Sequence, residues 1–236
     1  MLDCNDDDAP EPDYEAISVP GRSGDLHLWN DRWKNKMITY HCMCRANART
    51  NVPNILTQLI AQPGYQRITD SLHTSYYKMG TFVGGTAPVY SDGGETARFD
   101  LTFDCKPQKW LLSGETETSV ASGATVTLTN PTRFPAYPII KFKNTGTITL
   151  AHVNSSPAVS YTLTNNAPSS LSTTRMVFDC DLGDTYAASA SGRNYNQHIT
   201  LGGASGKLCL RAAGNTNVSF SGNMSTVAIT PRWYTL

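Results

Sequence analysis

The chain has 236 residues, and its 19 basic and 19 acidic residues give no formal net charge. This balance disfavours tight duplex binding, because proteins that grip nucleic-acid phosphates need a basic surface. No run of about 18 apolar residues predicts a membrane-spanning helix, and the acidic start MLDCNDDD is unlike a secretory signal peptide.

The first predicted feature is a rigid corner at Val19 to Leu26, in front of a segment that reads as a strand. Pro20-Gly21 and Ser23-Gly24 are turn formers, and together they predict a tight reversal of the chain. Arg22 and Asp25 then lie at its tip with opposite charges.

One helix is predicted in the stretch NVPNILTQLIAQPG. Its apolar residues follow the spacing of a single helical stripe: Val52, Ile55, Leu56, Leu59 and Ile60. We expect Asn51 to cap the helix and Pro63-Gly64 to end it. An isolated helix of this length is marginal in water, so the stripe needs a sheet to pack against.

The clearest strand runs from Ala97 to Cys105, where apolar residues alternate with Arg98, Asp100, Thr102 and Asp104. This alternation predicts one buried and one solvated face. The turn formers at Ser91 to Gly94 and the apolar Phe82-Val83 upstream predict a hairpin.

After Leu112 a polar stretch marks a predicted domain boundary, with domains at 1–115 and 116–236. The second half predicts short strands that alternate or run apolar, with Gly, Pro and Asn turns between them, which favours an antiparallel β-sandwich. The expected strands lie at Ala124–Leu128, Pro138–Lys143, Thr147–Val153, Val159–Leu163, Met176–Leu182, Lys207–Arg211, Val218–Phe220 and Val227–Trp233.

The candidates for chemistry each have a plainer interpretation. LGGASGKL (Leu201 to Leu208) lacks the glycine spacing and the hydroxyl of a phosphate loop, which favours a turn. In His41-Cys42-Met43-Cys44 the alternation of a strand places His41 on the face opposite Cys42 and Cys44, and no second Cys/His cluster completes a zinc site. His73 near Asp70 has no nucleophile beside it, and Asp179 and Asp181 are expected to be solvated.

Four of the six cysteines share one interpretation. Cys44, Cys105, Cys180 and Cys209 lie in apolar or strand-like runs, which predicts buried free thiols. No catalytic residue, cofactor or metal site is predicted, so the chain is not expected to be an enzyme. Aromatic residues of the second half can stack on sugar rings, and this leaves a glycan-binding role open for Tyr186, Tyr195, Trp233 and Tyr234.

Five stretches, in the same order along the chain, resemble the distal tail protein family of siphophages. They are APEPDYEAISVPGRSGDL (Ala9 to Leu26), GYQRITDSLHTSYYKMGTF (Gly64 to Phe82), LTFDCKPQKWLLSGE (Leu101 to Glu115), NPTRFPAYPIIKF (Asn130 to Phe142) and ITPRWYTL (Ile229 to Leu236). Together they span nearly the whole chain.

The resemblance implies a mainly β fold: an N-terminal β-sandwich with one α-helix and a projecting hairpin, followed by a C-terminal galectin-like antiparallel β-sandwich. It also implies a virion protein of the tail tip, made and assembled in the cytoplasm of the host bacterium. On this resemblance we expect six copies to form a ring between the tail tube protein and the tail-tip protein. We also expect a receptor-binding protein at its periphery and passage of DNA without specific binding.

The first 115 residues carry 11 basic and 15 acidic side chains, and the remainder carries 8 and 4. A mildly acidic first half fits a channel that lets DNA pass. Family members begin with a further apolar strand, and we expect that strand to be missing before APEPDYE. Its loss would expose a sheet edge.

The ring predicts a seam between copies. We expect Arg22 and Asp25 to lie at or near it, with an ordinary turn inside one chain as the alternative. Burial of apolar surface stabilises lasting subunit contacts, which commonly bury about 2,000 Å² or more. Tyr76, Tyr77 and Met79 are therefore interface candidates, and core packing is their alternative. The alternative function is a carbohydrate-binding module that contacts the host cell surface.

Overall fold

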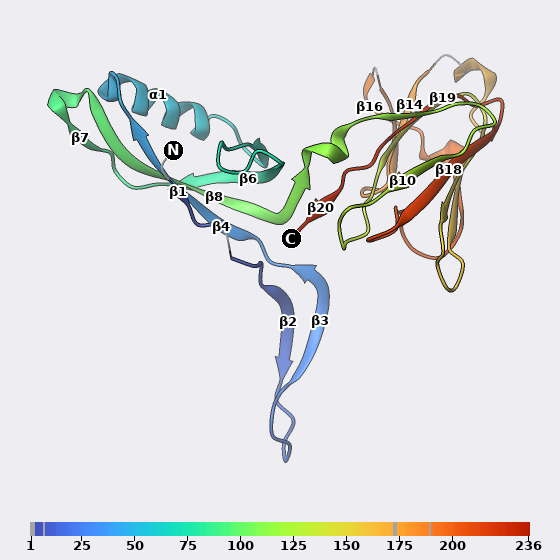
Figure 1. The fold of residues 1–236 in the computed structure, drawn as a ribbon, viewed down its shortest axis with the longest axis horizontal. Coiled ribbons are helices and arrows are strands. Elements are labelled where there is room, and N and C mark those ends of the chain that lie inside the picture. Colours follow the sequence, from blue (N-terminus) through green and yellow to red (C-terminus); the bar gives the residue numbers. More distant parts are fainter. Residues whose placement is uncertain (1–2, 7, 172–173, 189) are drawn as a thin grey trace. The chain divides into compact units, whose positions relative to one another are not determined.

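The structure is a computed structural model that describes residues 3–6, 8–171, 174–188 and 190–236 (Figure 1). It is mainly antiparallel β with one α-helix in these ranges, as expected. By packing, the chain divides into a first unit, Met1–Lys109 with Leu236, and a second unit, Trp110–Thr235. No helix among the described residues is long and apolar enough to cross a membrane.

The first unit is built on one sheet. Its strand order is β1 (Asp3–Cys4), β4 (Lys36–Cys44), β8 (Thr96–Leu111), β6 (Tyr76–Gly84) and β5 (Gln66–Ile68), and β7 (Val89–Ser91) also pairs with β8. The alternation predicted for β8 is confirmed, because its apolar positions are buried or half-buried and Arg98 is exposed. The predicted turn before it is the short 3₁₀ helix η1 (Asp92–Gly94), which joins β7 to β8.

The helix α1 (Ala48–Ile60) covers part of one face of this sheet. It begins earlier than predicted, and Asn47, not Asn51, occupies the N-cap position. Asn51 lies inside the first turn, where its side-chain amide donates a 2.9 Å hydrogen bond to the carbonyl of Ala46.

The predicted apolar stripe of α1 is only partly buried. Val52 is fully buried with Ala48, and Leu56 and Leu59 pack at the edge of the core. Ile60 is 72% exposed and Ile55 38%. The helix therefore contacts the sheet along the narrower line of residues 48, 52, 56 and 59, which are spaced four, four and three apart.

The strands β2 (Pro12–Ile17) and β3 (Leu26–Trp33) form a two-stranded antiparallel sheet of their own. Between them lies the predicted corner, where Gly21 and Gly24 adopt φ values of 79° and 86°. These left-handed values favour glycine, which has no Cβ to clash. Figure 1 shows this hairpin extending away from the sheet of its unit.

The second unit is a β-sandwich of two antiparallel sheets. One has the order β10 (Val126–Thr129), β18 (Asn215–Gly222), β12 (Gly146–His152), β13 (Ser160–Asn165) and β17 (Ile199–Gly203). The other has the order β16 (Ala190–Asn194), β15 (Asp184–Ala187), β14 (Met176–Asp179), β11 (Ile139–Lys143), β19 (Ser225–Thr230) and β9 (Thr118–Val120). Their facing side chains form one core around Ile140, Ile148, Leu163 and Phe178.

Short elements complete this unit: the 3₁₀ helices η2 (Leu112–Glu115), η3 (Ser169–Leu171) and η4 (Asn196–His198), and the strand β20 (Tyr234–Thr235). The domain boundary after Glu115 stays a prediction.

Three expectations for the second half were wrong. Lys207–Arg211 is not a strand, because only Leu210 makes an isolated bridge, to Ala136. The strand expected at Met176–Leu182 is shorter, because β14 ends at Asp179 and a turn follows, which leaves Leu182 70% exposed and not on a buried face. Asp179 is buried, where the Arg232 guanidinium binds both of its carboxylate oxygens at 3.0 Å.

The core of the second unit provides a stability test. Ile148 is fully buried between the two sheets, so Ile148→Ala should lower the free energy of unfolding of this unit by about 2 to 5 kcal/mol. Chemical denaturation followed by circular dichroism measures the change. Leu201→Ala, at a half-exposed position of β17, is the control and should cost less than about 1 kcal/mol. Equal effects of the two changes would contradict the sandwich core.

Candidate functional site

The hairpin β2–β3 is apolar on both of its faces. One face is aromatic: the rings of Tyr14 and His27 stack at 4.3 Å, and those of Trp29 and Trp33 meet edge-on at 5.3 Å. Tyr14 lies opposite Trp29 in the register of the two strands. All eight residues of β3 are exposed, so these rings are open to solvent.

The opposite face of the hairpin is aliphatic. Leu26 pairs with Ile17, and Leu28 pairs with Glu15. Because successive side chains of a strand alternate between faces, these residues lie on the face opposite the aromatic rings. Leu26 and Leu28 are each 46% exposed. Among the described residues β2 and β3 pair only with each other. Because a two-stranded hairpin alone is marginally stable in water, both faces need cover from outside this sheet.

The tip of the hairpin carries the predicted charged pair. The backbone N–H of Arg22 donates to the carbonyl of Val19 at 3.2 Å, which closes the turn. Arg22 and Asp25 are both exposed within this reversal. Their role at a seam stays a prediction.

The other interface candidates lie on β6 and divide over two faces of the main sheet. Tyr76 is half-buried on the core side, and its hydroxyl donates a 2.9 Å hydrogen bond to Asp6 Oδ2. Tyr77 and Met79 alternate with it and are half-buried on the other face. The Arg67 guanidinium lies 4.0 Å from the centre of the Tyr77 ring. The sequence-based interface role of all three stays a prediction.

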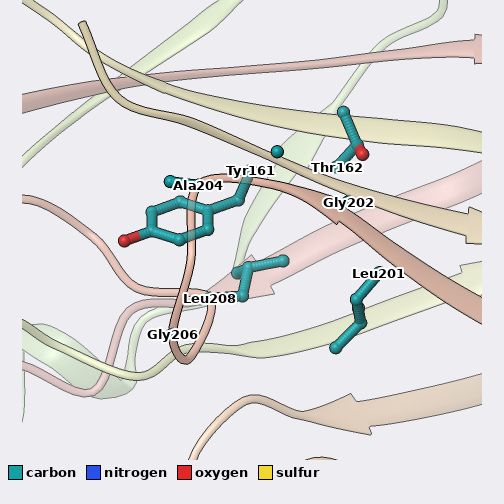
Figure 2. A pocket seen from close by; sticks show the side chains of 8 residues that line it. Tyr161, Thr162, Leu201, Gly202, Ala204, Gly206 and Leu208 are labelled. Carbon is teal, nitrogen blue, oxygen red and sulfur yellow. The ribbon is translucent and has the colours of Figure 1, made fainter.

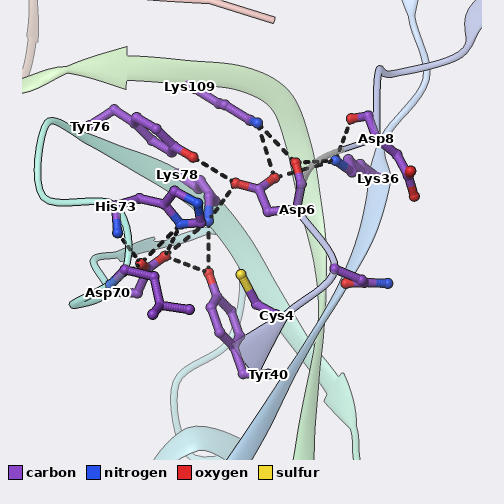
Figure 3. Close-up of polar contacts among 12 residues, drawn as sticks. Cys4, Asp6, Asp8, Lys36, Tyr40, Asp70, His73, Tyr76, Lys78 and Lys109 are labelled. Carbon is purple, nitrogen blue, oxygen red and sulfur yellow. Dashed lines mark hydrogen bonds and ion pairs between the residues drawn. The ribbon is translucent and has the colours of Figure 1, made fainter. Parts of the chain in front are cut away.

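A cluster of charged side chains surrounds Asp6 on the core side of the first unit (Figure 3). Lys78 Nζ lies 2.8 Å from Asp6 Oδ2 and 3.0 Å from Asp70 Oδ2. Lys36 and Lys109 approach Asp6 Oδ1 at 3.4 and 3.3 Å, and both also donate to the main-chain carbonyl of Asp6. We call these five residues the Asp6 cluster.

Hydroxyl and backbone groups complete the hydrogen bonding of the cluster. Lys78 donates to the Tyr40 hydroxyl at 3.0 Å. Asp70 Oδ1 accepts the backbone N–H groups of Leu72 and His73 at 3.0 and 2.7 Å. The N-terminal segment is thereby attached to β6 and β8 through Asp6. These contacts add to the pairing of β1 with β4, which involves only two residues of β1.

The protonation states follow from these contacts. Burial by itself raises the pKa of Asp6, but the Lys78 hydrogen bond and charge outweigh it and lower the pKa below the usual value. The pKa of Asp70 is lowered in the same way, against its burial. Burial lowers the pKa of Lys78, and its hydrogen bonds with Asp6, Tyr40 and Asp70 raise it overall. The side chains of Asp6, Asp70 and Lys78 therefore form ion pairs at neutral pH.

Sequence reasoning missed this cluster. The acidic start MLDCNDDD indicated only that a secretory signal peptide is absent from it, whereas the structure buries the side chain of Asp6 completely. One signal was available: Lys78 occupies a core-facing position of β6 between Tyr76 and Gly80, and a lysine at a buried position needs an acidic partner.

The glycan candidates of the second unit differ in exposure. Tyr195 and Trp233 belong to the core of the sandwich, with 7% and 5% of their surface exposed. Tyr186 on β15 is 37% exposed, and Tyr234 is half-buried with its ring stacked on Phe134. The structure does not gather the four into one platform.

The glycine-rich stretch LGGASGKL lines a small pocket of about 210 Å³ beside Tyr161 (Figure 2). Close packing between strands explains the glycine at position 203. A Cβ on Gly203, which has φ 93°, would come within 2.1 Å of the Ser160 carbonyl oxygen. Lys207 donates instead to the backbone carbonyl of Asp181 at 2.7 Å. This is the turn that the sequence predicted.

The His41–Cys44 stretch behaves as predicted. Cys42 and Cys44 pack on the core face of β4, and His41 Nδ1 lies 2.7 Å from Asp100 on the opposite face. The three potential ligands therefore do not converge. All six cysteines are free thiols, Cys105 and Cys180 are buried, and Cys44 and Cys209 are half-buried.

Comparison with known proteins gives a likeness of fold. No family model matches the chain, and no curated protein matches it. Among solved structures, the Dit protein of phage SPP1, described as a paradigm of the hub adsorption apparatus in phages that infect Gram-positive bacteria, aligns with a TM-score of 0.63 at 12% identity. The alignment covers 100% of this chain and 93% of that one. The baseplate of phage P2 aligns with a TM-score of 0.42 at 8% identity, over 91% of this chain and 87% of that one. The chain thus has the fold of the SPP1 hub protein.

Proposed function

We propose that this protein is a structural component of a phage tail tip, whose copies form a hexameric ring that joins the tail tube to the tip and adsorption apparatus. The observation that carries the proposal is the hairpin β2–β3, which exposes apolar side chains on both faces. A protein with this surface gains stability only when another chain covers it. The fold that it shares with a phage hub protein supports the choice of assembly.

The partner that fits the hairpin is the next copy of the same chain. In a closed ring every contact is head-to-tail, so one surface of each copy meets a different surface of its neighbour. An arm that extends from its own sheet supplies such a non-self-complementary surface. The corner with Gly21 and Gly24 fixes the shape of the tip of this arm. A fixed shape matters because the rotation between neighbouring copies must divide a full turn evenly for the ring to close.

Passage of DNA is part of the proposal. The first 115 residues carry 15 acidic against 11 basic side chains. A channel with this excess repels phosphates weakly, so it does not hold the genome by counterion release. The tail tube protein, the tail-tip protein and a receptor-binding protein are the proposed neighbours. The structural role requires no chemistry, and we do not propose an enzyme.

The ring is tested by electron microscopy and native mass spectrometry of the purified full chain. We expect six-fold particles for the wild type. Replacing Leu28 and Trp29, one residue on each apolar face, by serine should abolish them, because the seam loses its main buried surface. Asn30→Ser, at an exposed polar position of the same strand, is the matched control and should leave ring yield unchanged. A wild-type chain that stays monomeric at high concentration would contradict the proposal.

The charged tip gives a second test. If Arg22 and Asp25 contact the neighbouring copy, Arg22→Glu combined with Asp25→Arg should weaken each contact by up to about 1 kcal/mol, which is roughly fivefold in its equilibrium constant. Ring yield against protein concentration measures the effect, which should shrink at high salt. The conservative pair Arg22→Lys with Asp25→Glu is the control. Unchanged yield after the double reversal would remove these residues from the seam and leave the apolar faces as its basis.

A further inference from the structure

Lys78, Asp6 and Asp70 form a buried triad inside the Asp6 cluster. Their side chains are 2%, 0% and 5% exposed. Lys78 Nζ lies 2.8 Å from Asp6 Oδ2, the oxygen bonded to the carboxyl carbon Cγ. A second carboxylate, that of Asp70, lies 3.0 Å from the same nitrogen. An amine, a carboxyl group and a proton acceptor thus meet at a buried site. Figure 3 shows the three side chains directed toward one another.

We propose that Lys78 and Asp6 join in an intramolecular amide bond, with Asp70 as the proton carrier. The Nζ–Cγ bond forms and the Cγ–Oδ2 bond of Asp6 breaks. The ammonium of Lys78 has three protons; one stays on the amide nitrogen, and the other two reach Oδ2, which leaves as water. Because an ammonium and a carboxylate contain the atoms of an amide plus one water, the condensation needs no oxidant, reductant or cofactor.

Each group around the triad has a part in this step. Asp70 Oδ2 accepts a proton from Nζ as the nitrogen attacks, and the Tyr76 hydroxyl hydrogen-bonds to the departing Oδ2 at 2.9 Å. Negative charge collects on Oδ1 in the tetrahedral intermediate. The ammonium groups of Lys36 and Lys109 lie 3.4 and 3.3 Å from that oxygen, where they stabilise the charge.

The resting pair is ionic, because the pKa of Lys78 is raised and that of Asp6 is lowered by their mutual contact. The Lys78 amine becomes nucleophilic only after it has given up a proton. Because the deprotonated amine is rare, the condensation is slow. The fold compensates by holding the reactants in place permanently. Intramolecular partners that are well oriented reach effective molarities of about 10⁵ to 10⁸ M. The product also removes two charges from a buried site, where their desolvation is costly.

The bond would fasten the N-terminal segment to the sheet. Without it, the β-ladder that holds this segment consists of the two residues of β1, Asp3 and Cys4, paired with β4. An Asp6–Lys78 amide connects the segment covalently to β6 and restricts the unfolded chain, as a disulfide does. This gain is independent of the proposed ring, since every residue involved belongs to the first unit.

The test is the intact mass of the denatured full chain, whose sequence mass is 25.7 kDa. After allowance for the N-terminal methionine, we expect a mass lower by one water molecule and a proteolytic peptide that links Asp6 to Lys78. Lys78→Arg retains the positive charge but has no amine to condense, so its mass should equal its sequence mass. Asp70→Asn should also keep the full mass, with an unchanged circular dichroism spectrum.

The variant Asp6→Asn tests whether the new bond forms at Cγ of residue 6. An amide side chain at this position releases ammonia instead of water, so any mass loss should correspond to one ammonia molecule. Lys106→Arg, on β8 outside the cluster, is the control and should retain the water loss. A wild-type chain with its full sequence mass would overturn the proposal, and so would a water loss that persists in Lys78→Arg. Neither result depends on whether rings form.

Discussion

A two-stranded hairpin has no interior, so apolar residues on both of its faces cannot be buried by the hairpin itself. This constraint separates the hairpin from the main sheet of the first unit. Its sheet buries part of one face under α1, as a sheet of an ordinary domain does. The hairpin β2–β3 does not follow this rule, because its aromatic and aliphatic faces are both exposed. Exposed apolar surface of this kind marks sites of contact with other molecules.

The Asp6 cluster solves a different problem of the same unit. A short N-terminal segment pairs through two residues with the edge of β4, which is too little to hold it in place. Three lysines converge on Asp6 from β4, β6 and β8, and Asp70 supplies the second carboxylate. The segment is thus anchored by electrostatics where hydrophobic burial is lacking. Burying so many charges is tolerable because each is paired and hydrogen-bonded.

Sequence patterns predicted the regular elements where a single periodicity dominated. The alternation in β8 identified its buried face, and the glycines at 21 and 24 located the reversal between β2 and β3. The predicted start of the helix was too late, because asparagine favours the N-cap position and both Asn47 and Asn51 offer it. The burial of Ala48 against the sheet extends the helix back to Asn47, whose side chain makes no capping hydrogen bond. Lys207–Arg211 reads as a strand from its apolar residues, yet its strand pairing is a single bridge between Leu210 and Ala136.

The candidate site was predictable only in part, because local sequence patterns specify the elements but not their distant neighbours. The sequence by itself determined the fold class, the hairpin and the charges at its tip, because turn chemistry and period-two alternation are local properties of the chain. Only the tertiary structure decided that the hairpin keeps two uncovered apolar faces and that Asp6 meets Lys78 and Asp70. Burial and ion pairing depend on residues that lie far apart in the sequence, and no local pattern specifies which of them become neighbours.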